Sequence, residues 1–308
     1  MTAPPPSAEP PQACPHFDPR AVRRVGVMLA PHKSQVVETV CALISWFDAR
    51  GIQVLLRRDQ AAELGYVERG RAPAEMAEEA DLLLALGGDG TLLHTARLGA
   101  PLGTPILGVN VGGFGFLAAL PQEGLFPGLE EVLAGRFRLQ SRMMLHTQVH
   151  VDGAPAARFV SLNDVVVAKG AISRLLRIST HISGEAVSDL PADGVIVATP
   201  TGSTGYSLSA GGPVVDPELR AFIITPICPH TLSARTLLVP AHRRIRITVL
   251  GPGSEEVHLT ADGQESMSLR GVDWVEITEA SFSACLIVLA DDSFYARLRD
   301  KLGWGGPR

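Results

Sequence analysis

Residues 81–91 read DLLLALGGDGT, in which an unbroken apolar run, 82–86, is followed by a glycine-rich turn. A strand with one face in water would carry a polar residue at every second position, so this run indicates a parallel sheet covered on both faces. Further apolar runs lie at 23–30, 52–58 and 105–110, with helical patterns at 34–47, 73–79 and 91–97 between them. The alternation predicts a doubly wound α/β domain over residues 21–120.

The pattern changes after residue 120. One helical stretch remains within 121–135, and short runs of alternating character with glycine and proline between them then follow. They predict a second, β-rich domain, sandwich-like and mainly antiparallel, over residues 121–292. The last segment, 293–308, is expected to form a C-terminal helix that packs on the α/β domain. A chain of 308 residues has room for both domains.

The N-terminal residues 1–20 hold seven prolines in their first nineteen positions and no apolar segment, so we expect a disordered tail rather than a signal peptide. No run approaches the length of a membrane span, and a net charge of −5 argues against nucleic acid as a partner. Four well-separated cysteines without a C-x-x-C motif predict buried free thiols in a reducing cytoplasm. These are Cys14, Cys41, Cys228 and Cys285.

The segment from Gly87 to Thr91 follows a buried strand and opens a helix, which is where open α/β sheets bind ligands. Glycines allow close approach of the backbone, and the free amides of a helix N-terminus attract an anion. We therefore expect a phosphate loop of Gly87, Gly88, Gly90 and Thr91. Asp89 would repel a phosphate, which is explained if it holds a magnesium ion or accepts a proton from an attacking hydroxyl. The alternative is a tight turn in which Asp89 caps the helix.

Three other segments are candidates. Residues 108–120 (GVNVGGFGFLAAL) form either a hinge or a ligand contact. Residues 193–213 (DGVIVATPTGSTGYSLSAGGP) combine glycine, hydroxyl side chains and a tyrosine at a density unusual for a linker, which favours a binding loop. Asn163-Asp164 places an amide beside a carboxylate, although a turn explains the pair equally well.

Several chemistries are excluded by inspection. The chain lacks G-x-x-x-x-G-K-[ST], a G-x-G-x-x-G after its first strand, G-x-S-x-G around Ser203, and H-E-x-x-H. Only Lys33, Lys169 and Lys301 among the 27 basic residues are lysines. A phosphate site in this chain must therefore rely on arginine, backbone amides or a metal.

Taken together, GGDGT (87–91), Asn163-Asp164, residues 193–213, PHTLSAR (229–235) and ADGQ (261–264) resemble the NAD kinases in order and spacing. The resemblance implies an α/β domain joined to a β-rich domain. It also implies transfer of a phosphoryl group from ATP, or from polyphosphate, to the adenosine-ribose 2′-hydroxyl of NAD with Asp89 as the catalytic base. A divalent metal, Mg²⁺ first, is the implied cofactor, and a homodimer or homotetramer is the implied state.

The resemblance also implies the substrate-binding residues. Asn163 and Asp164 match the pair that binds adenine and ribose, and Gln264 lies in the DGQ motif. Arg174 stands where relatives often have a basic ligand contact. His94 stands where relatives carry a basic residue, or else lies on a solvated helix face. The NAD-binding segment corresponds to Asp193, Thr204, Gly205, Tyr206, Ser207, Leu208 and Ser209, with Asp89 and Gly90 completing the set.

The sequence departs from the family pattern at four positions. Asp164 replaces the commoner glutamate, Gly205 the commoner alanine, Gly113 an arginine of many relatives and Pro191 a lysine of some. The sequence leaves the donor and the choice between NAD and NADH open. A lipid or sphingoid kinase of the same superfamily, or a non-catalytic dinucleotide sensor, are the competing hypotheses.

Overall fold

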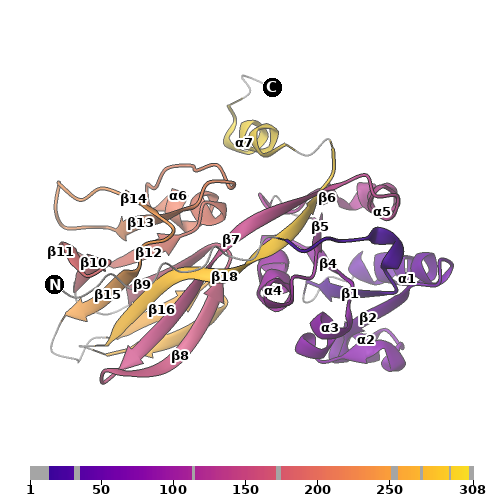
Figure 1. Cartoon of the computed structure of the whole chain (residues 1–308), viewed down its shortest axis with the longest axis horizontal. Helices are drawn as coiled ribbons and strands as arrows, with labels where there is room; N and C mark the ends of the chain where they lie inside the picture. Colours follow the sequence, from indigo (N-terminus) through magenta and orange to yellow (C-terminus); the bar gives the residue numbers. More distant parts are fainter. Residues whose placement is uncertain are drawn as a thin grey trace. The chain divides into compact units, whose positions relative to one another are not determined.

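The structure is a computed structural model that describes residues 14–30, 35–112, 115–170, 175–250, 256–270, 273–290 and 293–304. Its described residues fall into two compact units. The α/β unit consists of the described residues up to Ser141 and from Ser283 onward, and the β unit consists of Arg142–Phe282. Figure 1 labels the helices and strands of both units and colours them along the sequence.

The α/β unit is built on a parallel sheet. Its strands are β1 (Arg24–Leu29), β2 (Gln53–Arg57), β3 (Gly70–Arg71), β4 (Leu82–Gly87), β5 (Ile106–Asn110), β6 (Leu120–Pro121) and the end of β18 (Trp274–Val288). They pair in the order β18-β5-β4-β1-β2-β3, with β6 beside β5. All six residues of β4 are buried, as an apolar strand covered on both faces requires.

Helices cover both faces of this sheet. On one face Val27 and Leu29 of β1 pack with Phe47 of α1 and Leu129 of α5, while on the other face Met28 packs with Met76 of α3. Successive strand residues point to opposite faces, so this alternation makes the sheet doubly wound. These helices are α1 (Gln35–Asp48), α2 (Arg58–Glu63), α3 (Pro73–Glu79), α4 (Asp89–Gly99) and α5 (Leu125–Leu133). A further helix, α7 (Phe294–Leu302), belongs to the same unit and ends the described chain.

The β unit contains two groups of strands. The first is the antiparallel sheet β14-β13-β12-β9-β16-β17, and the second places β7 and β8 with β11-β10-β15-β18. Val167 of β9, Val197 of β12, Ile178 of β10 and Ile247 of β15 belong to one buried cluster, so the unit has the sandwich-like core that was expected. The remaining bounds are β7 (Arg138–Val151), β8 (Ala154–Ser161), β9 (Asp164–Lys169), β10 (Leu176–Ile182), β11 (Glu185–Ala192), β12 (Gly194–Ala198), α6 (Tyr206–Ser209), β13 (Ala221–Ile227), β14 (Leu237–Pro240), β15 (Ile245–Leu250), β16 (Val257–Ala261) and β17 (Glu265–Leu269).

The fold class predicted from the sequence is confirmed, and its boundaries differ from those expected. The α/β unit extends to Ser141 rather than to residue 120, because α5 packs Leu125, Leu129 and Val132 into the α/β core. Residues 14–20, expected in the disordered tail, are ordered, with Asp18 accepting from the Arg20 amide ahead of a short 3-10 helix, Pro19–Ala21. Among the described residues, none of the helices has both the length and the apolar character of a membrane span.

The expectation of four free thiols is wrong for two of them. Cys14 and Cys285 form a disulfide with their Cα atoms 5.5 Å apart. Cys285 lies on the buried end of β18, and Cys14 lies on the N-terminal segment. No turn or motif in the sequence indicates that these two distant positions meet. Cys41 and Cys228 are free, and Cys228 is exposed rather than buried.

Candidate active site

The glycine-rich turn after β4 brings the backbone close to the first turn of α4. A Cβ at Gly87 would collide with the Thr91 side chain, whereas a Cβ at Gly88 would meet open space. The Thr91 amide donates to the carbonyl of Gly88 (3.0 Å). The eleven-residue helix α4 thus begins beside the open space at Gly88, and a helix N-terminus next to open space suits an anion.

Asp89 is the first residue of α4, and residues 115–117 cover its side chain. Asp89 Oδ2 accepts from the Phe116 amide (2.8 Å) and Oδ1 accepts from the Leu117 amide (3.1 Å). A Cβ at Gly115 would collide with the same carboxylate, so glycine permits this close approach. The alternative reading as a helix cap is therefore not what the structure shows, because the carboxylate bonds to the loop and α4 has no side-chain cap.

The loop 108–120 thus has a role that its sequence left open. It carries the amides that fix the orientation of Asp89, and Gly113 within it lies outside the described residues.

His94 lies near the middle of α4, where its Nδ1 is 3.4 Å from a guanidinium nitrogen of Arg97. His94 is half-buried and takes part in a contact within its own helix.

In the β unit, Asn163 and Asp164 are held at the start of β9 by Asp262. The Asp262 carboxylate accepts from three successive amides, those of Leu162 (3.0 Å), Asn163 (2.7 Å) and Asp164 (3.2 Å). Asp262 lies in the turn between β16 and β17 and adopts a positive φ of 51°. Its hydrogen bonds join residues about a hundred positions apart in the sequence. This positioning residue was missed by sequence reasoning, which selected only Gln264 from the same ADGQ motif.

The loop after β12 joins the same arrangement. Thr199 donates from its amide to the carbonyl of Asn163 (2.8 Å) and from its hydroxyl to the carbonyl of Leu162 (2.6 Å). A Cβ at Gly202 would collide with the Asn163 backbone. A Cβ at Gly205 would lie 3.5 Å from Asn163 Nδ2 and 3.7 Å from Asp164 Oδ2, so Gly205 borders the Asn163-Asp164 pair.

The environment of the pair is suited to a polar ligand. Burial raises the pKa of Asp164 from its ordinary value to about 7, and the adjacent Asp262 carboxylate acts in the same direction. Asn163 Oδ1 is buried and has no hydrogen-bond partner among the described residues. A buried acceptor without a partner is costly, so this oxygen is suited to an N–H donor of a ligand.

The other residues that were expected to bind substrate do not all lie near the Asn163-Asp164 pair. Asp193 precedes β12 and forms an ion pair with Lys169 (2.8 Å). Thr199, which contacts Asn163, follows the other end of the same strand, so Asp193 is remote from Asn163. Ser207 is fully buried and its hydroxyl lies 3.0 Å from that of Thr225, so it faces the interior. Thr204 and Leu208 are half-buried, while Tyr206, Ser209 and Gln264 are exposed. Arg174 lies outside the described residues.

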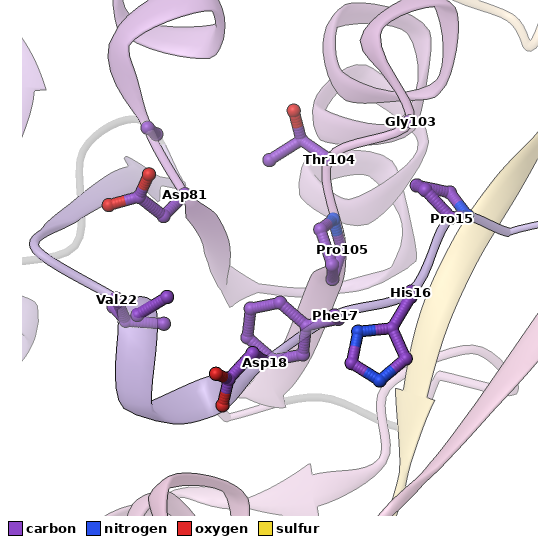
Figure 2. Close-up of a pocket in the computed structure, with 11 residues that line it drawn as sticks. Pro15, His16, Phe17, Asp18, Val22, Asp81, Gly103, Thr104 and Pro105 are labelled. Atoms are coloured by element: carbon purple, nitrogen blue, oxygen red, sulfur yellow. The ribbon is translucent and has the colours of Figure 1, made fainter.

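A separate cavity of about 260 Å³ lies at the other edge of the α/β sheet. It is lined by Phe17, Asp81 and Pro105 among others, and so lies where β4 and β5 begin rather than where they end (Figure 2). Gly88 and Asp89 follow the carboxyl end of β4, so this cavity is not part of the candidate site.

Comparison with known proteins agrees with this geometry. A family model described as the ATP-NAD kinase N-terminal domain matches residues 25–137, and one described as the ATP-NAD kinase C-terminal domain matches residues 162–289. The NAD kinase of Moorella thermoacetica is 48% identical over 287 residues, covering 93% of this chain and 91% of that one. The NAD kinase of Heliobacterium modesticaldum is 42% identical and covers 91% and 99%.

Solved structures extend the comparison. Yeast NADH kinase in complex with NADH superposes with a TM-score of 0.85 at 27% identity, covering 93% of this chain and 89% of the other. An NAD kinase from Archaeoglobus fulgidus in complex with ATP shares the fold, with a TM-score of 0.68 at 24% identity and coverage of 91% and 97%. The chain therefore belongs to the NAD kinase family.

Proposed function

We propose that this chain transfers the terminal phosphoryl group of ATP to the adenosine-ribose 2′-hydroxyl of NAD, giving NADP and ADP, with Asp89 as the general base. The single observation that carries the assignment of the base is the fixed carboxylate at the start of α4, held by the amides of Phe116 and Leu117. It lies at the carboxyl end of a buried parallel strand, where ligands of such sheets bind.

The reaction needs little covalent chemistry from the protein. As the ribose oxygen bonds to the terminal phosphorus, the bond from that phosphorus to the bridging oxygen of ADP breaks, and Asp89 takes the hydroxyl proton. The N-terminus of α4, with its partial positive charge, would attract the phosphate oxygens, and Gly90 and Thr91 would lie close to them. A fixed carboxylate is preferable to a mobile one because no reorientation is needed in the transition state.

The β unit would bind the adenosine of NAD. Asn163 Oδ1 would accept from the adenine amino group, and the ionised Asp164 carboxylate would accept from ribose hydroxyls. Gly205 borders both side chains, which supports a contact between its backbone and the same nucleoside. The remaining positions assigned by resemblance stay part of the proposal.

A divalent cation fits the donor set if the substrates supply most of its ligands. The described residues contain no group of three histidine, cysteine or acidic side chains that could hold a metal ion, and Asp89, the carboxylate of the phosphate loop, is assigned here to the proton. Magnesium commonly keeps several waters and binds substrate phosphates, so phosphates and waters would supply its ligands. When bound, Mg²⁺ would neutralise charge on the phosphates.

The proposal includes a homodimer or homotetramer, as the family resemblance implies, and the cytoplasmic location expected from the sequence. Light scattering on the purified chain measures the oligomeric state directly. Formation of NADP from NAD, or of NADPH from NADH, with ATP, other nucleoside triphosphates or polyphosphate determines the donor and the acceptor.

The decisive experiment replaces Asp89 with asparagine and measures NADP formation from NAD and Mg-ATP. We expect turnover to fall by about 10²- to 10⁴-fold, since the general base is lost. NAD affinity, measured by calorimetry, should remain close to that of the wild type. Wild-type protein that binds NAD but makes no NADP with any donor would instead support the dinucleotide sensor.

A matched control is available at the other end of β4. Asp81 also accepts from two backbone amides, those of Arg23 and Arg24 (2.8 Å each), but lies at the edge of the sheet remote from the phosphate loop. Asp81→Asn should cost stability without the loss of turnover. An equal loss in both variants would show that the effect is structural and would contradict the role of Asp89.

A further inference from the structure

The short helix α6 is anchored in the β unit by a serine rather than by an apolar side chain. Ser207 is the one buried residue of α6, whereas Tyr206 and Ser209 are exposed. A surface helix is ordinarily held by an apolar stripe that faces the core. No side chain caps the N-terminus of α6 either. The contact that the Ser207 hydroxyl makes is therefore central to how this helix is held.

The Ser207 hydroxyl bonds to a threonine of the six-stranded sheet. Its oxygen lies 3.0 Å from Thr225 Oγ1, and Thr236 donates from its hydroxyl to the same Thr225 oxygen (3.3 Å). Thr225 belongs to β13 and Thr236 precedes β14, so three hydroxyls form a chain from α6 to the edge of this sheet (Figure 1). A Cβ at Gly212 would collide with both Ser207 Oγ and Thr225 Oγ1. The backbone of Gly212 thus covers the Ser207–Thr225 pair.

The sheet face around this pair is apolar. Thr225 is 1% exposed and lies between Ile223 and Ile227 on one face of β13. Both isoleucines belong to a buried cluster with Ile196 of β12. A hydroxyl buried among apolar side chains costs free energy unless it is hydrogen-bonded, and valine would fill the same space without that requirement. A hydrogen bond also has a preferred direction, so it restricts how α6 can rotate against the sheet.

The helix that this pair holds begins at the candidate binding site. Gly205 is the residue before α6 and borders the Asn163-Asp164 pair. The Leu208 amide of α6 donates to the carbonyl of Gly205 (3.2 Å), which joins Gly205 to the helix. Tyr206 follows Gly205 and is exposed, on the side of α6 away from the sheet. A rotation of α6 would therefore displace the backbone that borders the pair.

We propose that the hydrogen bond between Ser207 and Thr225 is a positioning contact for NAD, which fixes α6 so that Gly205 faces the nucleoside of the substrate. This inference rests on the proposed function, and it gives Ser207 a role through the protein interior rather than by contact with NAD. Thr236 directly follows the PHTLSAR segment, 229–235, and supplies a second partner to Thr225. The end of this segment thus supports the same contact.

The test removes each hydroxyl in turn and measures the Kd for NAD by calorimetry and KM from NADP formation. Thr225→Val keeps the shape of the side chain, and we expect the Kd and KM for NAD to rise by about fivefold or more, as the loss of a buried hydrogen bond implies. Thr225→Ser keeps the hydroxyl and should retain most of the affinity. Ser207→Ala should also weaken NAD binding and still fold, because Thr225 keeps Thr236 as its partner. KM for ATP should stay within about twofold in every variant, since the contact acts only on the acceptor.

Thr147→Val is the matched control. Thr147 is also fully buried in the β unit, on β7, but its hydroxyl has no hydrogen-bond partner among the described residues. This substitution should leave the Kd for NAD unchanged, and thermal unfolding reports whether each variant is folded. The double variant of Ser207→Ala and Thr225→Val should bind NAD no more weakly than Thr225→Val alone, because the two hydroxyls act through one bond.

The outcomes distinguish the positioning contact from the proposed function. An unchanged Kd for NAD in folded Thr225→Val and Ser207→Ala would overturn the positioning contact, and so would a loss of affinity in Thr225→Ser equal to that in Thr225→Val. Equal weakening in Thr147→Val would show a general effect of the core and would also overturn it. Weaker NAD binding in Thr225→Val and Ser207→Ala, with no NADP formed by the wild type from any donor, would retain the contact and overturn the proposed function.

Discussion

Burial, together with the adjacent Asp262 carboxylate, raises the pKa of Asp164 to about 7, and its proposed contact with the ribose leads us to expect a pH-dependent affinity for NAD. Its pKa is raised to about 7, so the side chain gains its negative charge as the pH rises through that value. An ionised carboxylate accepts hydrogen bonds from two hydroxyls, whereas the protonated form has lost part of that capacity. We therefore expect NAD affinity, measured by calorimetry, to increase as the pH rises from about one unit below to about one unit above this pKa.

The unfolding free energy should change in the opposite direction. The folded state binds the Asp164 proton more tightly than the unfolded chain does, so its contribution to stability is full below the ordinary pKa of 3.8 and is lost progressively as the pH rises from there to about 7. Asp164→Asn should bind NAD more weakly and with a flatter pH profile. A profile as steep as that of the wild type would assign the titration to another group.

Asp262 determines where the Asn163-Asp164 pair lies, since its two oxygens accept from three amides. Asp262→Asn keeps the size and tolerates the positive φ, but replaces one acceptor oxygen with a donor. We expect the unfolding free energy to fall by about 1–3 kcal/mol and KM for NAD to rise, with KM for ATP unchanged. Asp152→Asn is the control, because Asp152 has a similar φ of 50° in an exposed hairpin turn. Equal effects of both substitutions would contradict the positioning role.

At the scale of elements, the sequence predicts what depends on local pattern. The unbroken apolar run of β4 indicates burial on both faces, and all six of its residues are buried. The position of Asp89 at the start of a helix follows from the same pattern. The glycines of 108–120 signal an unusual backbone, but no local pattern says which side chain their amides will face, so the covering of Asp89 by residues 115–117 was found only in the structure.

Pairings between distant segments explain the other differences. Helix α5 has an ordinary amphipathic pattern, and nothing in it states that it belongs to the earlier sheet rather than the later strands. The contact of Asp262 with the Asn163-Asp164 pair, and that of Lys301 with Phe116, join residues far apart in sequence. The roles of individual binding residues came from the family resemblance, because their types alone also fit turns and surface loops.

At the scale of the whole molecule, the β unit is an insertion in the α/β unit. The chain leaves the α/β unit at Ser141 and returns at Ser283, so that Leu286 of β18 pairs with Ile106 of β5. The last strand and helix of the α/β unit thus come from the end of the chain. Folding of this unit must therefore bring together segments separated by the entire insertion, which raises the entropic cost of closing it.

The disulfide between Cys14 and Cys285 reduces that cost. It joins the N-terminal segment to β18 across 271 residues and so encloses the insertion in one covalent loop. Because a long loop restricts the unfolded chain strongly, we expect reduction, or Cys14→Ser, to lower the unfolding free energy by about 2–4 kcal/mol. Denaturant unfolding with and without a dithiol reductant measures the difference in the wild type, and Cys14→Ser should not respond to reductant. Cys228→Ser, at an exposed free thiol, should behave as the wild type. Wild-type protein with the same stability in both conditions would show that the bond does not hold the two ends of the α/β unit together.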